Sequence, residues 1–155
     1  MRPLRYYVET SVWNFLLEEN RLEHRKVTER FFQQLEQLGT IGISDVVLAE
    51  IERAPEARRK ALKGLIAKYR PELLELNQEA EQLADRYIEA GLIPKRYRND
   101  ALHLAIAVDH DYDVVVSWNF EHMVRLSTRL GVNGTNKILG YREIEIVSPE
   151  EVVIP

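Results

Sequence analysis

The chain has 155 residues, 45% of them hydrophobic, which suits one globular domain with a buried core. It contains no cysteine, and this excludes disulfides, thiol catalysis and thiolate metal sites. The formal net charge of −4 argues against a protein that coats nucleic acid through its overall charge.

Strand-like and helix-like patterns alternate through the first half of the chain. The expected elements are a strand over 4–8, a helix from about Thr10, a helical face at Val27, Phe31, Leu35 and Leu38 that stops at Gly39, a strand over 41–43, a helix capped by Ser44, and a helix from Pro55 to about Arg70. The helix after Ser44 carries Glu50.

The alternation continues in the second half. The expected elements are a strand over 73–76, a helix carrying Ala80, Leu83, Ala84, Tyr87 and Ile88 that stops at Gly91, a loop over 92–98, a helix capped by Asn99, a strand over 114–116, a helix near 121–130, a loop-like stretch over 131–140, and a last strand over 144–147. The run Val114–Val116 is β-branched throughout, which is typical of a strand buried on both faces.

Alternating strands and helices without hairpin signals predict an α/β fold, in which helices cover a central parallel sheet. We find no linker, repeat or low-complexity tract, so residues 1–155 are expected to form a single domain. Sites in such sheets lie beyond the carboxyl ends of the strands. Glu9 and Asn119 follow strands and Asp100 opens a helix, so all three can point into one crevice.

Glu50 lies within an apolar helical stripe, with Val46 and Val47 one turn before it and Ala54 one turn after. A carboxylate in that position loses hydration unless a cation or hydrogen-bond donors compensate. The alternative interpretation is an acid at the edge of the stripe, held by an arginine.

Glu9 and Asp100 each have a structural alternative as well. A carboxylate at the end of a strand can accept backbone N–H groups of the next helix, and an acid in the first turn of a helix is favoured by the helix dipole. His103, one turn after Asp100, could face the same crevice, but a hydrogen-bonded core histidine is the favoured interpretation.

A functional site is indicated more strongly by the combination of four polar positions than by any one of them. These positions are Glu9, Glu50, Asp100 and Asn119. Oxygen ligands suit Mg²⁺ or Mn²⁺, and such ions on a carboxylate cluster can activate water against a phosphate ester. Basic residues lie nearby in two clusters, seven of them from Arg53 to Arg70 and three just before Asp100, at 95, 96 and 98. They suit a phosphate backbone, although solvated helix faces would look the same.

Five short motifs occur in order along the chain: Tyr-Tyr-Val-Glu-Thr-Ser at 6–11, Ser-Asp-Val-Val-Leu-Ala-Glu-Ile at 44–51, Asn-Asp-Ala-Leu-His-Leu-Ala-Ile-Ala at 99–107, Val-Ser-Trp-Asn-Phe-Glu-His at 116–122, and Gly-Tyr-Arg at 140–142 followed by Ser-Pro-Glu-Glu-Val at 148–152. In this order they resemble the PIN-domain ribonucleases, and in particular the VapC-type toxins. The motif at 99–107 is the most specific of the five.

The resemblance implies a three-layer α/β/α domain and an endoribonuclease that cuts single-stranded RNA with Mg²⁺ or Mn²⁺ and activated water. By motif match, Glu9, Glu50 and Asp100 would hold metal, Asn119 would complete the pocket, and Ser11 would support it through a hydrogen bond. The implied partners are RNA and an antitoxin protein.

The sequence departs from the family pattern at Glu9, where the family usually has Asp, and the extra methylene moves the carboxylate by roughly 1.5 Å. The alternative function is therefore a catalytically impaired PIN fold that only binds RNA or a protein. A phosphoacceptor receiver is disfavoured, because Asn77 and Ser148 stand where it needs Asp and Lys, and no glycine-rich phosphate loop follows a strand.

The sequence also bears on location and self-association. There is no apolar signal-like run at the N-terminus and no stretch near the ~20 apolar residues that span a bilayer, so a cytoplasmic protein without a membrane segment is expected. Exposed aromatic residues on a small domain would suit a homodimer.

Overall fold

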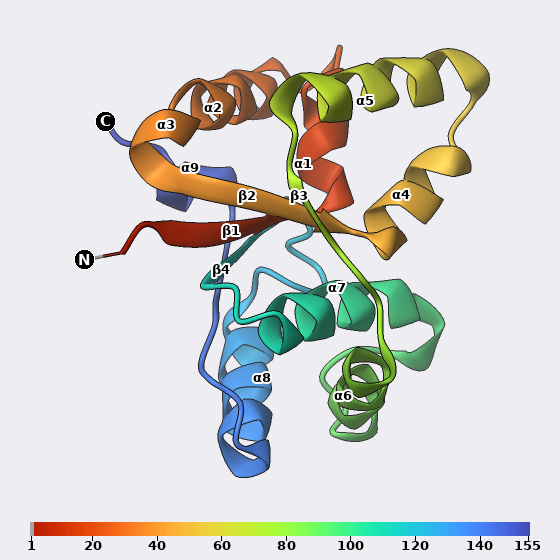
Figure 1. Ribbon diagram of the computed structural model, residues 1–155, viewed down its shortest axis with the longest axis vertical. Helices are drawn as coiled ribbons and strands as arrows, with labels where there is room; N and C mark the ends of the chain where they lie inside the picture. Colours follow the sequence, from red (N-terminus) through yellow and green to blue (C-terminus); the bar gives the residue numbers. More distant parts are fainter. Residues whose placement is uncertain (1) are drawn as a thin grey trace.

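The computed structural model describes residues 2–155, and Figure 1 shows the elements in chain order. The elements are β1 Leu4–Val8, α1 Thr10–Phe15, α2 Leu22–Gln33, α3 Leu35–Leu38, β2 Gly39–Ser44, α4 Asp45–Glu52, α5 Glu56–Tyr69, β3 Glu72–Leu74, α6 Gln78–Glu89, the 3₁₀ turn η1 Lys95–Tyr97, α7 Arg98–Asp109, β4 Val114–Val116, α8 Leu126–Leu139, β5 Glu145–Val147 and α9 Pro149–Val152. Within residues 2–155, no helix combines the length and the apolarity needed to cross a bilayer.

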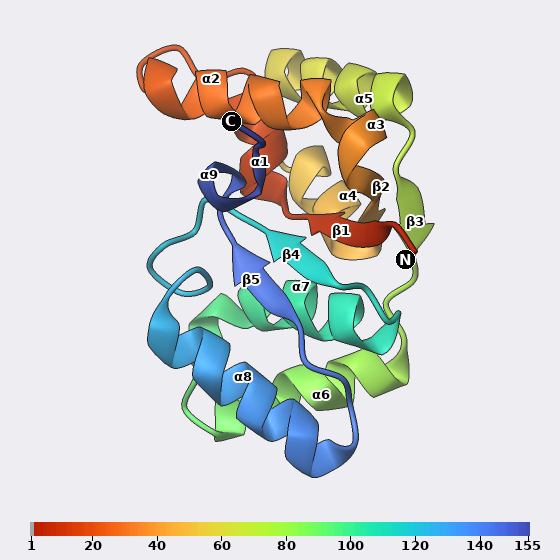
Figure 2. The ribbon, with the colours of Figure 1, turned by 90° about the vertical axis from the view of Figure 1, so that its left-hand side faces the viewer.

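The five strands form one parallel sheet in the order β3-β2-β1-β4-β5. In Figures 1 and 2, helices α1, α2, α3 and α5 lie on one side of it and α6, α7 and α8 on the other. This is the α/β/α fold expected from the alternation of elements. Helix α4 lies beyond the carboxyl end of β2, between the two layers.

The middle strand β1 and its neighbour β4 are fully buried toward their carboxyl ends. Tyr7 and Val8 of β1 and Val115 and Val116 of β4 have no exposed surface, and Val8 pairs with Val116 at the carboxyl ends. The β-branched run at 114–116 is thus a strand covered on both faces, as predicted. The residues that follow Val8 and Val116 therefore lie at the same edge of the sheet.

The predicted helical face over 27–38 is divided between two helices, because the chain breaks at Gln34. The Gln34 side chain exchanges hydrogen bonds of 2.8 and 2.9 Å with the backbone of Ile154, which anchors the break to the C-terminal segment. Gly39 ends α3 as expected and also begins β2, which is longer than the predicted strand over 41–43.

Two expectations for the second half of the chain were wrong. Residues 131–140 do not form a loop: α8 runs through Gly131 and Gly134 to Leu139. An added Cβ at Gly131 would lie 2.1 Å from Cδ2 of Leu92, so tertiary packing explains this glycine and overrides its low helix propensity. The helix predicted near 121–130 begins only at Leu126, since the preceding residues make turns.

Two boundaries are shifted. Helix α7 begins at Arg98, so Asn99 lies in its first turn and does not cap it. Strand β3 occupies Glu72–Leu74, two residues short of the predicted end. By contrast, Ser44 caps α4 as expected, accepting the N–H of Val46 at 3.2 Å.

Asp113 ties the beginnings of β1 and β4 together. Its carboxylate accepts bonds of 2.6 and 3.0 Å from the Arg2 guanidinium and one of 2.8 Å from the Arg5 N–H. Burial acts to raise the pKa of Asp113, but the bonds to Arg2 and Arg5 outweigh it and hold that pKa below its usual range.

Replacing Asp113 with Asn is expected to lower the free energy of unfolding by about 1 kcal/mol at neutral pH, the net value of such charge-assisted bonds to a half-exposed arginine. Because the folded-state pKa is depressed, this stabilisation is present above the pKa of the unfolded state and is lost as the pH falls through the folded value. Urea titrations at pH 7 and at about pH 3 check it. An equal difference at both pH values would contradict this account.

Candidate metal and nuclease site

The candidate site lies at the carboxyl edge of the sheet. Glu9 follows β1 and Ser117 follows β4, and the N–H of Glu9 donates to the carbonyl of Val116 at 3.0 Å, so the pairing of the two strands continues into the site. Glu50 comes from α4 and Asp100 from the first turn of α7, two helices that contact each other.

The carboxylate of Glu9 is buried, with 6% of the residue exposed, and the protein supplies its donors. Oε1 accepts the hydroxyls of Ser11 and Ser117, each at 2.6 Å, and Oε2 accepts the N–H of Ser11 at 3.1 Å. Glu9 thereby caps α1, the structural role considered in the sequence. Ser11 in turn accepts the N–H of Trp118 at 2.9 Å, which fixes the loop after β4.

Glu50 is half-buried and is held by two strong donors. Its Oε1 accepts the hydroxyl of Thr10 at 2.6 Å and is 2.7 Å from Nε2 of His103. Burial acts to raise the pKa of Glu50, but the bond and charge of His103, with the bonds of Thr10 and Asn99, outweigh it and hold the pKa below its usual range. Glu50 is therefore a carboxylate held ionised by its neighbours. The alternative interpretation expected an arginine as its partner, and the structure has a histidine there.

His103 is fully buried and links Glu50 to the core. Its Nδ1 lies 2.6 Å from the hydroxyl of Tyr7, which lies 2.7 Å from the hydroxyl of Ser44. Burial opposes the imidazolium, but the bond to Glu50 and the charges of Glu9 and Glu50 raise the pKa of His103. Its Nε2–H donates to Glu50 in either protonation state, so His103 is a hydrogen-bonded core histidine, the interpretation favoured from the sequence.

Replacing Tyr7 with Phe is expected to lower the free energy of unfolding by about 1–3 kcal/mol, because it leaves Nδ1 of His103 and the hydroxyl of Ser44 buried without this partner. Thermal unfolding monitored by circular dichroism measures the loss. The matched control is Tyr97→Phe, since Tyr97 is only partly buried. An equal loss in both variants would contradict a special cost at Tyr7.

Asp100 accepts bonds from the loop that follows β4. Its Oδ2 lies 3.3 Å from Nδ2 of Asn119 and 3.0 Å from Nδ1 of His122, whose ring stacks on Tyr97 with centroids 4.1 Å apart. Burial raises the pKa of Asp100, and the charge of Glu9 raises it further. A cation bound between Asp100 and Glu9 would relieve both the burial and this repulsion.

The closest group of potential metal ligands consists of Glu9, Glu50 and His103, whose ligand atoms lie within 4.8 Å of one another. Nε2 of His103 is 4.0 Å from Oε2 of Glu9. Asp100 lies outside this group but on the same edge, with Asn119 bonded to it. The structure thus brings the sequence-predicted residues to one region, where His103 orients Glu50 through its Nε2–H and is not itself free to bind a cation.

The donor set fits a hard cation. In Glu50 and Asp100, one carboxylate oxygen accepts the two bonds described above and the other stands outside them. In Glu9, Oε2 accepts a single N–H. Carboxylate oxygens held in place by neighbouring protein donors are the ligands that Mg²⁺ and Mn²⁺ prefer.

Three residues of the site were missed in the sequence. Ser117 has a signal that could have found it, because it follows a buried strand as Glu9 does. Thr10 was considered only as the start of a helix. His122 follows Asn119 by three residues, and its contact with Asp100 depends on the turn in which Oδ1 of Asn119 accepts the N–H of His122 at 2.9 Å.

The basic clusters are partly engaged by the protein itself. Arg58 donates to the side chain of Asn14 at 2.8 Å, Lys63 pairs with Glu52, and Arg98 pairs with Asp85. Arg58 binds Asn14 of α1, the helix that Glu9 caps. Its guanidinium is therefore on the same side of the molecule as the site.

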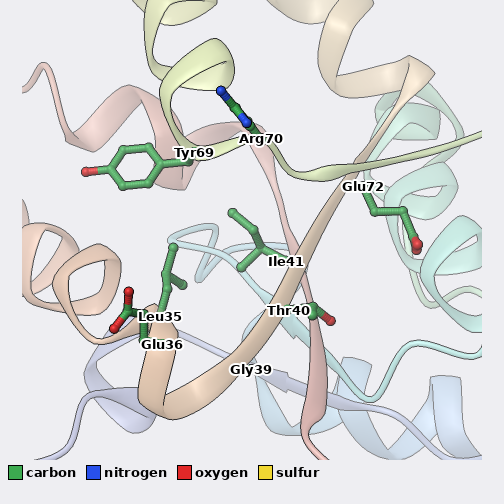
Figure 3. A pocket seen from close by; sticks show the side chains of 8 residues that line it. All are labelled: Leu35, Glu36, Gly39, Thr40, Ile41, Tyr69, Arg70 and Glu72. Carbon is green, nitrogen blue, oxygen red and sulfur yellow. The ribbon is translucent and has the colours of Figure 1, made fainter.

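A cavity of about 580 Å³ lies away from these acids, beside the amino-terminal half of β2 (Figure 3). It is lined by Leu35, Glu36, Gly39, Thr40, Ile41, Tyr69, Arg70 and Glu72. Because Gly39 begins β2 whereas the acids lie at the carboxyl ends of the strands, this hollow is separate from the candidate site.

Comparisons with known proteins agree with this geometry. The model of the PIN domain matches residues 6–121. A search of curated proteins finds no match.

Several solved structures share the fold at low sequence identity. VapBC2 from Rickettsia felis bound to a DNA fragment from their promoter superposes with a TM-score of 0.61 at 16% identity, covering 94% of this chain and 98% of that one. VapBC-1 from nontypeable Haemophilus influenzae gives 0.57 at 17%, covering 95% and 99%. Mycobacterium tuberculosis VapC20, described as a sarcin-ricin loop cleaving toxin, gives 0.57 at 14%, covering 76% and 92%.

Proposed function

The chain belongs to the PIN domain family, whose model covers residues 6–121, and from this premise we propose that it is a metal-dependent endoribonuclease that hydrolyses single-stranded RNA. The observation that carries the proposal is the gathering of Glu9, Glu50 and Asp100 at the carboxyl edge of the sheet, each fixed by protein donors. Burial and the charge of Glu9 raise the pKa of Asp100, a cost that a bound cation would relieve.

We assign Glu9, Glu50 and Asp100 as the residues that would hold Mg²⁺ or Mn²⁺, with Asn119 completing the pocket and Ser11 orienting Glu9. When bound, the ion would supply activation of water and neutralisation of charge on the phosphate. The protein's own contribution is orientation: His103 and Thr10 fix Glu50, and His122 fixes Asp100.

The relatives support the substrate and the partner. VapC20 is described as a sarcin-ricin loop cleaving toxin, and VapBC-5 from Mycobacterium tuberculosis as a member of the VapBC family of toxin-antitoxin systems. A VapC-like toxin with an RNA target and an antitoxin is therefore the role we propose. Both would be met in the cytoplasm, where we propose that the protein acts.

The test is a cleavage assay on a labelled single-stranded RNA, with the purified protein in Mn²⁺ or Mg²⁺. Cleavage is expected with either ion and is expected to stop on addition of EDTA. A DNA oligonucleotide of the same sequence serves as the substrate control. Cleavage that survives EDTA would contradict the proposal, as would an RNA left intact with both ions.

A catalytically impaired binding protein remains the second candidate, because Glu9 replaces the usual Asp. The contacts of Glu9 oppose this alternative: its longer arm reaches the hydroxyl of Ser117 across the sheet edge at 2.6 Å. If Glu9 is the residue for which this pocket is built, Glu9→Asp should lower the cleavage rate, because a carboxylate drawn back by roughly 1.5 Å loses these donors.

Single-turnover rates of the wild type and Glu9→Asp decide between the two candidates. Glu19→Asp is the matched control, because it removes the same methylene group from a glutamate that is exposed. A large gain in rate with Glu9→Asp would instead show that the natural site is impaired.

A further inference from the structure

Phe120 is the one exposed aromatic side chain among residues 2–155, with 47% of its surface accessible, whereas every other Phe, Tyr and Trp is buried or half-buried. It belongs to the loop between β4 and α8, which Figure 2 shows beyond the carboxyl end of β4. Phe120 directly follows Asn119, whose Nδ2 bonds Asp100, and consecutive Cα atoms are about 3.8 Å apart. The most accessible aromatic ring of the chain therefore stands beside the acids of the candidate site.

The ring of Phe120 has a firm support in Trp118. The two rings make an edge-to-face contact, with centroids 6.0 Å apart and planes at 71°. Trp118 is itself buried: its Nε1–H donates to the hydroxyl of Thr28 at 2.9 Å, and its ring lies 4.2 Å from that of His24 between centroids. An edge-to-face contact covers at most one face of a ring, so Trp118 holds Phe120 and leaves its other face uncovered.

The backbone around Phe120 is fixed as well. The N–H of Asn119 donates to the hydroxyl of Ser117 at 2.9 Å, and the N–H of Phe120 donates to the carbonyl of Trp118 at 3.0 Å. The carbonyl of Asn119 accepts the N–H of Val124 at 2.9 Å. A ring positioned in this way has little freedom left to lose when a ligand stacks on it, and such preorganisation favours binding.

The charges next to Phe120 favour a base over a phosphate at this ring. Glu121, the next residue, has a side chain that is 80% exposed, and its carboxylate would repel a phosphate. Arg125 of the same loop is exposed and donates to the carbonyl of Glu121 at 3.1 Å, so a cation for the phosphate backbone stands farther along the loop. An aromatic face accepts any unpaired base, because every base has a π-face.

We propose that Phe120 is a stacking platform for one unpaired base of the RNA, next to the phosphate that the acids would hold. The inference rests on the proposed function, since its ligand is the single-stranded substrate of that site. It adds a reason for the preference for single strands: a base inside a duplex is already stacked on its neighbours and cannot offer its face to the protein. Stacking is tolerant of sequence, so Phe120 positions the strand and does not read it.

The test measures binding and not cleavage. The Kd of a labelled single-stranded RNA is determined by fluorescence anisotropy in Ca²⁺, which binds carboxylates with a looser geometry than Mg²⁺. Phe120→Ala is expected to raise the Kd at least about fivefold, because it removes the stacking face. Phe120→Tyr keeps the ring and should bind within about twofold of the wild type. Phe120→Leu keeps only apolar surface and should bind as weakly as Phe120→Ala.

The matched control is Ile138→Ala, which truncates an apolar side chain that is 83% exposed near the far end of α8. Its Kd for RNA should equal that of the wild type. Unchanged affinity in Phe120→Ala overturns the proposal, and it is the result expected if the ring contacts a protein partner instead. Full affinity in Phe120→Leu also overturns it, because the contact would then need apolar surface and no ring.

Abasic nucleotides identify the stacked base. In a series of RNAs that each lack one base, the wild type should lose affinity at least about fivefold at one position, and Phe120→Ala should lose much less there, because both changes remove the same contact. Equal losses in the two proteins overturn the proposal. Failure of the proposed function has a different signature: RNA stays uncut in Mg²⁺ and Mn²⁺ while Phe120→Ala still weakens binding. A wild type that binds no RNA overturns both.

Discussion

Asp100→Asn is expected to reduce RNA cleavage by at least about 100-fold, because a metal-bound site contributes several kcal/mol of charge stabilisation and each 1.4 kcal/mol is a factor of ten. The amide keeps the shape of the side chain but removes the charge that would bind a cation. Rates should be measured at saturating Mn²⁺ and Mg²⁺, with thermal unfolding of the same samples to show that the variant is folded.

The matched control for Asp100 is Asp111→Asn. Asp111 is an exposed carboxylate with a φ of 59°, a conformation that Asn also tolerates, and it lies before β4, at the other end of the strand from the site. Its cleavage rate should equal that of the wild type. Equal cleavage by Asp100→Asn and the wild type would remove Asp100 from the proposed mechanism.

Gly39→Ala is expected to lower the free energy of unfolding by about 3–5 kcal/mol, combining a strained backbone with a steric clash. Gly39 has a φ of 150°, and a Cβ there would lie 2.1 Å from the carbonyl oxygen of Leu4 on the neighbouring strand. Neither atom can move without separating β1 from β2. Urea unfolding should show the loss.

Gly64→Ala provides the contrast. Gly64 lies inside α5, and apart from its chain neighbours and the adjoining backbone of its own helix, no atom of residues 2–155 stands within 4 Å of its ideal Cβ. Alanine there should therefore stabilise the protein by about 0.5–1 kcal/mol. Similar effects of the two substitutions would mean that helix and strand propensity, and not the approach of Leu4, decides the role of Gly39.

Local sequence signals predicted an element correctly where tertiary contacts did not override its pattern. The strand at 114–116 and the cap at Ser44 follow from the local residue types alone. Helix α8 cannot be predicted in this way, because the glycine at 131 is explained by its close contact with Leu92, 39 positions earlier in the chain. The break at Gln34 likewise depends on Ile154, at the far end of the chain.

The same division applies to the candidate site. Glu9 and Asp100 stand at ends of elements, where an acid can be recognised along the chain, and Glu50 interrupts an apolar stripe. The partners that fix these acids come from other elements: His103 reaches Glu50 from α7, and Ser117 reaches Glu9 from the end of β4. Such pairs are set by strand order and helix packing, which a periodicity cannot give.

The hydrogen-bonded chain from Ser44 through Tyr7 and His103 to Glu50 bears on how folding and cation binding are related in this protein. It runs from the hydrophobic core to the candidate site, so the acid is oriented by the same contacts that form the sheet. Every donor in this hydrogen-bonded chain is a protein group, so the orientation of Glu50 does not need a bound cation. Folding and cation binding are then separate equilibria, in contrast to small domains that acquire their fold only when the metal arrives.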